Sequence, residues 1–203
     1  MRESSPTKIT QYRVTVGEVI AVIVGVLWIA SLGAIGLAIK FMKNTFNPYR
    51  AEAIAHHIMD YTIPGNPRGM LGVNTAGLKF ALIASGKSAI PDTWLLVAKV
   101  PVNQQRDRSQ IEEILDNILT SQMAEEVNIV ASRVEDRNFC HFNTPVTIQE
   151  SQLIIPETPQ PEVALTYKAS TNLGDRKYIL ILSTVGENTT QKADNIFNSL
   201  KCK

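Results

Sequence analysis

The sequence of 203 residues is poor in histidine and aromatic residues, and it has no charge of one sign in excess. Its 20 Lys and Arg residues balance 19 Asp and Glu residues, so the formal net charge is +1 and the pI is near 7.8. A nucleic-acid-binding domain usually carries a basic patch and a pI above about 9. The charge balance therefore excludes nucleic acid as the expected partner.

Cysteine is also scarce: Cys140 and Cys202 are the only two, too few for a disulfide-rich scaffold or a four-ligand zinc site. Cys140 and His141 are adjacent in a predicted strand, where neighbouring side chains point to opposite faces. We therefore expect no nucleophile–base pair there, and we expect Cys140 to pack as a small hydrophobe. Whether Cys140 pairs with Cys202 is left open.

Motifs that would indicate an enzyme are missing as well. The sequence has no G-x-S-x-G, H-E-x-x-H, P-loop, strand-led G-x-G-x-x-G or EF-hand loop, and each of these places reactive groups or ligands in a fixed geometry. The candidate site nearest to a motif is His56, His57 and Asp60, but two ligands spaced four apart do not close a metal site. We expect no catalytic residues, no metal and no cofactor.

One long apolar run stands out. Residues 19–39 read VIAVIVGVLWIASLGAIGLAI without a charge, and about 20 apolar residues are needed to cross a bilayer as a helix. The run is longer than the apolar core of a signal peptide, roughly 7–15 residues. The sequence therefore predicts a transmembrane helix over 19–39 that acts as an uncleaved signal anchor, after a polar tail (1–18) and before a connector (40–47).

Small residues recur along this predicted span. Ala30, Gly33, Ala34 and Ala38 are three or four residues apart, a spacing that lets a second membrane helix approach closely. They are candidate helix-packing residues, and they predict an integral membrane protein or complex as partner, with the lipid bilayer around them. Three Lys or Arg residues flank the span on each side, so charge does not orient it. The short tail favours an extracytoplasmic domain, in a periplasm or lumen, at an inner or thylakoid-type membrane.

Residues 48–203 predict a single domain. Asn47 and Pro48 are typical of a helix start, and the apolar spacing predicts a helix from there to Tyr61 with His56 and Asp60 on its solvent side. Helices are also predicted from the capping pattern of Ser109 and from Asn188. Strands are predicted over 77–85, 93–100, 127–134, 139–150, 151–155, 162–169 and 177–184. The expected fold class is α+β, an antiparallel sheet packed by helices.

The stretch AEAIAHHIMDYTIPGNPRGMLGVNTAGLKFALIA resembles a group of uncharacterised single-pass bacterial membrane proteins, in which an anchor precedes a helix ending in I-x-D-Y-x-[IL]-P. The matching residues are Ile58, Asp60, Tyr61, Ile63 and Pro64. The later order of strands and helices is similar to that of PsbP/Mog1-like accessory domains. Both resemblances imply a binding or accessory role and supply no catalytic residues.

These observations predict a membrane-anchored protein-binding module, an accessory subunit or assembly factor of a membrane complex. A membrane-tethered domain that binds a small molecule or lipid is the alternative, and a hydrolytic enzyme comes third. A pocket with converging polar groups would favour the alternative, whereas a large exposed apolar patch would favour protein binding.

Overall fold

The computed structural model describes residues 16–75, 77–86, 91–102, 113, 117, 126–154 and 160–203. The chain divides into two compact units, Met1–Met42 and Lys43–Lys203. The first unit contains most of helix α1 (Val16–Thr45), and the second contains every other described element.

Helix α1 differs from the expected anchor. It extends beyond residue 39 through Lys40 and Lys43 to Thr45, so charged and polar residues belong to the helix itself. Within the described ranges, no helix combines the length and the apolar character needed to cross a membrane. This finding contradicts the transmembrane helix predicted over 19–39.

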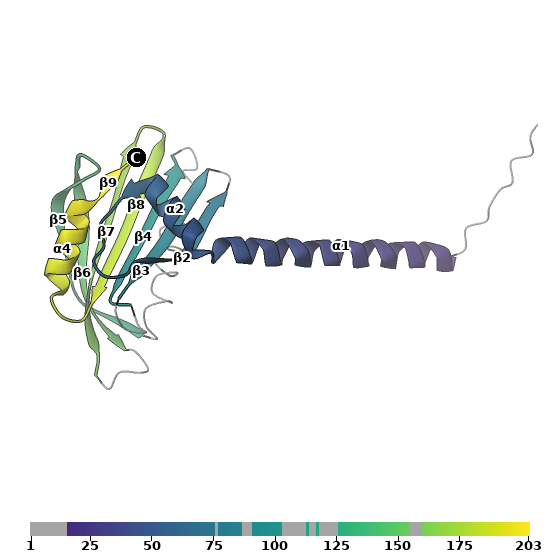
Figure 1. Ribbon diagram of the computed structural model, residues 1–203, viewed down its shortest axis with the longest axis horizontal. Helices are drawn as coiled ribbons and strands as arrows, with labels where there is room; N and C mark the ends of the chain where they lie inside the picture. Colours follow the sequence, from purple (N-terminus) through teal and green to yellow (C-terminus); the bar gives the residue numbers. More distant parts are fainter. Residues whose placement is uncertain are drawn as a thin grey trace, which may run out of the picture. The chain divides into compact units, whose positions relative to one another are not determined.

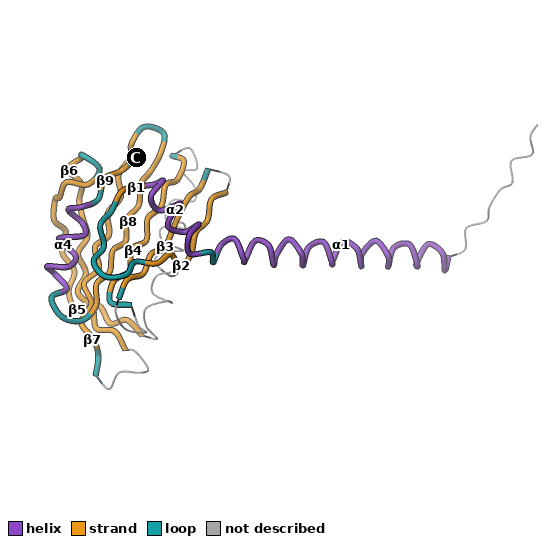
Figure 2. The backbone as a smooth tube through the Cα atoms, in the orientation of Figure 1, coloured by secondary structure: helices purple, strands orange, loops and turns teal. Residues whose placement is uncertain are grey.

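The second unit is built around one large sheet (Figures 1 and 2). Its strands are β2 (Arg68–Thr75), β3 (Leu78–Ser85), β4 (Thr93–Pro101), β5 (Glu126–Phe139), β6 (Phe142–Ile154), β7 (Glu162–Leu173) and β8 (Arg176–Val185). They form a seven-stranded antiparallel sheet in the order β2-β3-β4-β8-β7-β6-β5. A separate two-stranded sheet joins β1 (Met59–Asp60) to β9 (Lys201–Cys202).

The sheet corrects the predicted fold class, because strands dominate the domain and the α+β prediction is wrong. Strand β5 runs through to Phe139 and β6 begins at Phe142, so the predicted break between residues 134 and 139 does not exist. Strand β2 occupies a glycine-bearing segment in which no strand was predicted. The described helices of this unit, α2 (Pro48–Ile58) and α4 (Thr189–Ser199), have only 11 residues each.

The glycines of β2 explain why that strand was missed. A Cβ atom added at Gly69 would lie 2.2 Å from the Pro48 carbonyl oxygen, and one at Gly72 would lie 2.6 Å from Ala51 Cα. Helix α2 therefore crosses β2 at a distance that only glycine permits. A glycine inside a strand can mark such a close backbone approach instead of a break.

Helices α2 and α4 lie on the same face of the sheet (Figure 1). Asn47 caps α2 by accepting the Arg50 N–H at 3.2 Å, and Pro48 occupies the first turn, as predicted. The helix ends at Ile58, three residues before the predicted end, because Met59 turns into β1. Asn188 adopts a left-handed conformation and makes no side-chain cap, so the predicted capping at the start of α4 is wrong.

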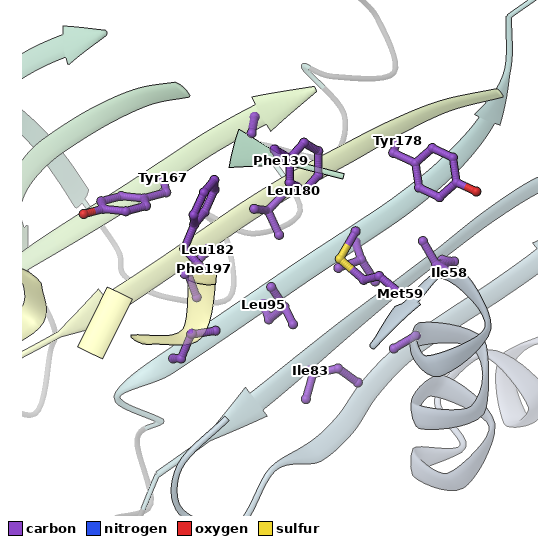
Figure 3. Packing of buried hydrophobic residues seen from close by; sticks show 14 of the residues in the cluster. Ile58, Met59, Ile83, Leu95, Phe139, Tyr167, Tyr178, Leu180, Leu182 and Phe197 are labelled. Atoms are coloured by element: carbon purple, nitrogen blue, oxygen red, sulfur yellow. The ribbon is translucent and has the colours of Figure 1, made fainter. Parts of the chain in front are cut away.

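The core beneath these helices joins residues from both of them to the sheet. Figure 3 shows Phe197, a residue of α4, beside Tyr167 and Leu182 of the sheet, and Ile58 with Met59 where α2 ends. The opposite face of the sheet also buries apolar side chains, among them Leu82, Trp94, Leu96, Ile179 and Ile181. The helix predicted from Ser109 lies outside the described residues except for Glu113 and Asn117, which are helical. The loop predicted over 156–162 also lies mostly outside them.

Candidate protein-docking site

Strand β5 is one edge of the seven-stranded sheet, and it is the candidate docking element. It is 14 residues long and pairs only with β6 among the described strands. Its apolar side chains Ile129, Val130 and Val134 are 60%, 65% and 64% exposed. A long edge strand with exposed apolar side chains is a template for pairing with another chain. The opposite edge, β2, has 8 residues and is packed by α2.

The turn between β5 and β6 fixes which backbone groups of β5 point outward. Phe139 is paired with Phe142, and the two residues between them, Cys140 and His141, have φ values of 55° and 69°. Two positive φ values identify a type I′ turn, in which the flanking residues form a hydrogen-bonded pair. Bonding direction alternates along an antiparallel strand. The N–H and C=O groups of Ser132, Val134, Asp136 and Asn138 therefore point away from β6.

This turn also corrects the sequence prediction for Cys140 and His141, which do not lie within a strand. Neither residue is a glycine, and L-residues adopt the left-handed region at a cost of roughly 1–2 kcal/mol each. Cys140 forms a disulfide bond with Cys202, 62 residues later, and is 4% exposed. The bond ties the turn to β9 and holds this end of β5 in place.

Alternating charges follow β5 on the side of the sheet that carries α4. Arg133 Nε lies 2.9 Å from Glu135 Oε1, and Arg133 Nη1 lies 2.8 Å from Glu150 Oε1. Arg137 Nη2 lies 2.7 Å from the other oxygen of Glu135. Hydrogen bonds from Arg133 and then Arg137 lower the pKa of the Glu135 carboxyl. Glu135 is therefore ionised at neutral pH, between two cations.

Arg137 connects this edge to helix α4. Its Nη1 atom lies 2.5 Å from Asp194 Oδ1, and the same oxygen accepts a hydrogen bond from the Tyr167 hydroxyl at 2.8 Å. The guanidinium carbon lies 4.9 Å from the centre of the Tyr167 ring, within the range of a cation–π contact. Burial lowers the pKa of Arg137, but its hydrogen bonds to Asp194 and Glu135 raise it overall. Strand β5 is thus anchored at its Phe139 end.

A groove lies on the opposite face of the sheet, over β6, β7 and β8. Its volume is about 450 Å³, and its lining includes Thr147, Lys168 and Ser170. Lys168 is the cross-strand partner of both Thr147 and Ile181, so these side chains point to one face. Glu113 also lines the groove, with Ile181 among its apolar residues. It combines a cation and hydroxyl groups with apolar walls.

The residues of the candidate metal site have other partners. The His56 ring stacks on Tyr61 with centroids 4.5 Å apart, and Asp60 forms a 2.6 Å ion pair with Lys203. His56, His57 and Asp60 are all exposed. Solvent exposure was predicted for His56 and Asp60, although Asp60 lies in β1 and not in the helix. The described residues contain no group of three or more His, Cys, Asp or Glu side chains that could hold a metal ion.

The predicted helix-packing residues all lie on α1. Ala30, Gly33, Ala34 and Ala38 are exposed, and a Cβ atom added at Gly33 would meet nothing within 4 Å. The surface at Gly33 is therefore open to another chain. Helix packing through these four residues stays a prediction.

Comparison with known proteins shows no family for this chain. No protein-family model matches the sequence, and no curated protein matches it. Among solved structures, the chain is similar to LpqN. This protein is described as involved in cell envelope biogenesis of Mycobacterium tuberculosis, and its crystal structure aligns with a TM-score of 0.38 at 10% identity, over 74% of this chain and 95% of LpqN. A likeness at this level carries no functional argument.

Sequence reasoning did not place β5 at an edge of the sheet, and it left the pairing of Cys140 with Cys202 open. The apolar residues of β5 predict a strand. Their pattern does not show whether that strand lies in the middle of the sheet or at its edge. The disulfide was hidden because Cys202 follows the last helix, far from Cys140 in sequence. The alternating charges of Arg133, Glu135 and Arg137 were the available signal, since charges are frequent on edge strands.

Proposed function

We propose that this protein is a protein-binding accessory module, a subunit or assembly factor of a membrane protein complex, and that it docks through the outer edge of β5. The observation that carries the proposal is the 14-residue edge strand β5. The side chain of Val134 in this strand is 64% exposed, and the N–H and C=O groups of Val134 point away from β6. Strand addition to such an edge gives affinity through main-chain hydrogen bonds and specificity through alternate side chains.

The anchoring of β5 supports this role. A strand that must receive another strand loses less conformational entropy on binding when it is already held in place. Arg137 joins β5 to Asp194 of α4, and the Cys140–Cys202 disulfide holds the adjoining turn. The exposed edge is therefore preorganised for docking.

The disulfide also supports an extracytoplasmic location. Disulfide bonds persist in secreted, periplasmic and other oxidising compartments and are rare in the reducing cytosol. Both cysteines of the chain are used in the single bond. We therefore propose that the module works in an oxidising compartment of the cell envelope or in a lumen.

Site-specific photocrosslinking tests the docking edge. A benzophenone-bearing amino acid at Val134 should yield one crosslinked product of defined mass, identified by mass spectrometry. The matched control is Val163 on β7, which is 55% exposed but does not lie on the edge strand. Val134→Pro removes an outward N–H and should reduce capture by a second probe at Ser132. Equal products from Val134 and Val163 would contradict docking at β5.

The groove over β6, β7 and β8 favours a second candidate function, the binding of a small and largely apolar molecule. Pockets of roughly 300–1,000 Å³ with apolar walls and a few polar groups typically hold such ligands, and this groove is about 450 Å³. A medium-chain fatty acid is the probe. Calorimetry should show binding that Ile181→Trp abolishes by filling the groove, whereas absence of binding to the unmodified chain would remove this candidate.

A further inference from the structure

We infer that the strand received by β5 is β5 of a second copy of this chain, so that the docking edge joins two copies of the module into a symmetric dimer. The inference rests on the proposed docking edge and identifies its partner. It is carried by the charge pattern of β5 together with the direction of its backbone groups.

The backbone limits how two copies of β5 can pair. Residue Val130 has no partner in β6, because Ile129 pairs with Ser151 and Ala131 pairs with Glu150. This bulge interrupts the edge, so the regular outward pattern runs from Ala131 to Asn138. In an antiparallel pair the outward residues of one copy must face outward residues of the other. Only registers that pair even-numbered residues with even-numbered residues meet this condition.

Side-chain charge then selects one of these registers. When Val134 lies opposite Val134 of the second copy, Arg133 faces the second copy's Glu135, and Glu135 faces its Arg133. Ser132 faces Asp136 and Ala131 faces Arg137, so no like charges are opposed. Opposite charges across an antiparallel pair stabilise it, and like charges destabilise it.

The neighbouring registers are disfavoured by charge. A shift of the centre by one residue toward Arg133 places two arginines opposite each other at that position. A shift toward Glu135 opposes two Glu135 carboxylates and also pairs Arg133 with Arg137. A shift to Asp136 opposes two aspartates. The register centred on Val134 is therefore the one in which β5 is complementary to itself.

Two further observations fit this register. Arg133 and Glu135 have side-chain exposures of 45% and 38%, so both can reach a second chain while they keep their contacts within β5. They stand opposite each other in the pairs without backbone hydrogen bonds, where Cα atoms approach to about 4.5 Å. Charged side chains, especially lysine, can protect an edge from pairing, but charges that alternate in sign, as these do, are complementary to a second copy in this register.

Charge reversal tests both the dimer and its register on the full chain with its disulfide intact. The wild-type chain should sediment as a dimer. Arg133→Glu and Glu135→Arg should each weaken dimerisation roughly tenfold or more, because two symmetry-related attractions become repulsions. An equimolar mixture of the two variants should form a heterodimer of wild-type affinity. One variant then carries two carboxylates at these positions and the other carries two guanidinium groups, so both cross-strand contacts join opposite charges.

A cysteine at the centre of the register gives an independent measurement. Val134→Cys should form an intermolecular disulfide on mild oxidation, because paired Cα atoms lie at about 5.5 Å, within disulfide range. Val163→Cys is the matched control and should remain monomeric on a non-reducing gel. Thermal unfolding should confirm that all variants are folded.

Three results would overturn the inference. They are a monomeric wild-type chain, a dimer that neither charge reversal weakens, and a mixture of the two variants that fails to associate. The proposed docking function would survive the first result if the probe at Val134 still captured a different protein. It would fail together with the inference if that probe captured nothing.

Discussion

The hydroxyl of Tyr167 donates a hydrogen bond to Asp194 Oδ1 at 2.8 Å, and the same oxygen accepts a hydrogen bond from Arg137 Nη1. Tyr167 is fully buried on β7, Asp194 is on α4 and Arg137 is on β5. One carboxylate thus holds a helix, a central strand and the edge strand together.

Asp194→Ala should lower the free energy of unfolding by about 1–3 kcal/mol, because the buried Tyr167 hydroxyl and the Arg137 guanidinium would lose their shared acceptor. Urea denaturation followed by circular dichroism measures this change. Asp175→Ala is the control, since Asp175 pairs with Arg176 at 3.4 Å and its side chain is 77% exposed. It should change stability by less than about 0.5 kcal/mol. Equal effects would show that Asp194 does not anchor β5.

Tyr167 should also make stability depend on alkaline pH. Burial and then the hydrogen bond to Asp194 raise its pKa from 10.0 to about 12. The folded state therefore holds the phenolic proton more tightly than the unfolded state. This contribution is fully present below pH 10 and is lost as the pH rises to about 12. Tyr167→Phe should remove that part of the pH dependence, and Tyr49→Phe, at an exposed position, should leave it unchanged.

Gly72→Ala should destabilise the sheet domain by about 1–3 kcal/mol, the usual cost of overpacking. The added methyl group would lie 2.6 Å from Ala51 Cα, which is backbone and cannot rotate away. Thermal unfolding gives the measurement. Gly36→Ala is the control, because a Cβ atom there meets nothing within 4 Å. A Gly72→Ala chain as stable as wild type would show that α2 can move away from β2.

Loss of the disulfide should lower stability by about 2–4 kcal/mol, as expected for a cross-link that closes a long loop. The double variant Cys140→Ser/Cys202→Ser should unfold at lower urea than the oxidised wild type and at the same urea as the reduced wild type. A thiol assay on the unfolded wild-type chain should detect no free thiol before reduction. Detection of two thiols in that assay would contradict the bond.

Local elements were more predictable than the fold as a whole. The strands predicted over 77–85 and 93–100 were confirmed as the antiparallel pair β3 and β4, because their apolar residues and the turn between them are contiguous. The cap at Asn47 and the buried face of α4 through Ala193, Ile196 and Phe197 were confirmed for the same reason. Each depends on residues within a few positions of one another.

The errors arose where distant residues decide the structure. The glycines Gly69 and Gly72 are typical of a loop in the sequence. Their role in β2 is explained only by the close approach of α2, which is distant from them in the local pattern. Cys140 and His141 both have positive φ values, and Cys140 forms the disulfide with Cys202. The residues on either side of them contain no glycine or proline that would predict a turn. The edge position of β5 depends on the order of seven strands, which no single segment encodes. The anchoring role of Arg137 likewise depends on Asp194, 57 residues away.

The bond between Cys140 and Cys202 also sets an order of events during synthesis. The hairpin of β5 and β6 can form as soon as it leaves the ribosome, but its turn cannot be cross-linked until β7, β8 and α4 have followed. During that interval the edge strand is present without its covalent restraint. An edge strand that is exposed before its cross-link forms is open to pairing with other unfolded chains, so late closure of this bond makes β5 the segment most prone to misassembly during folding.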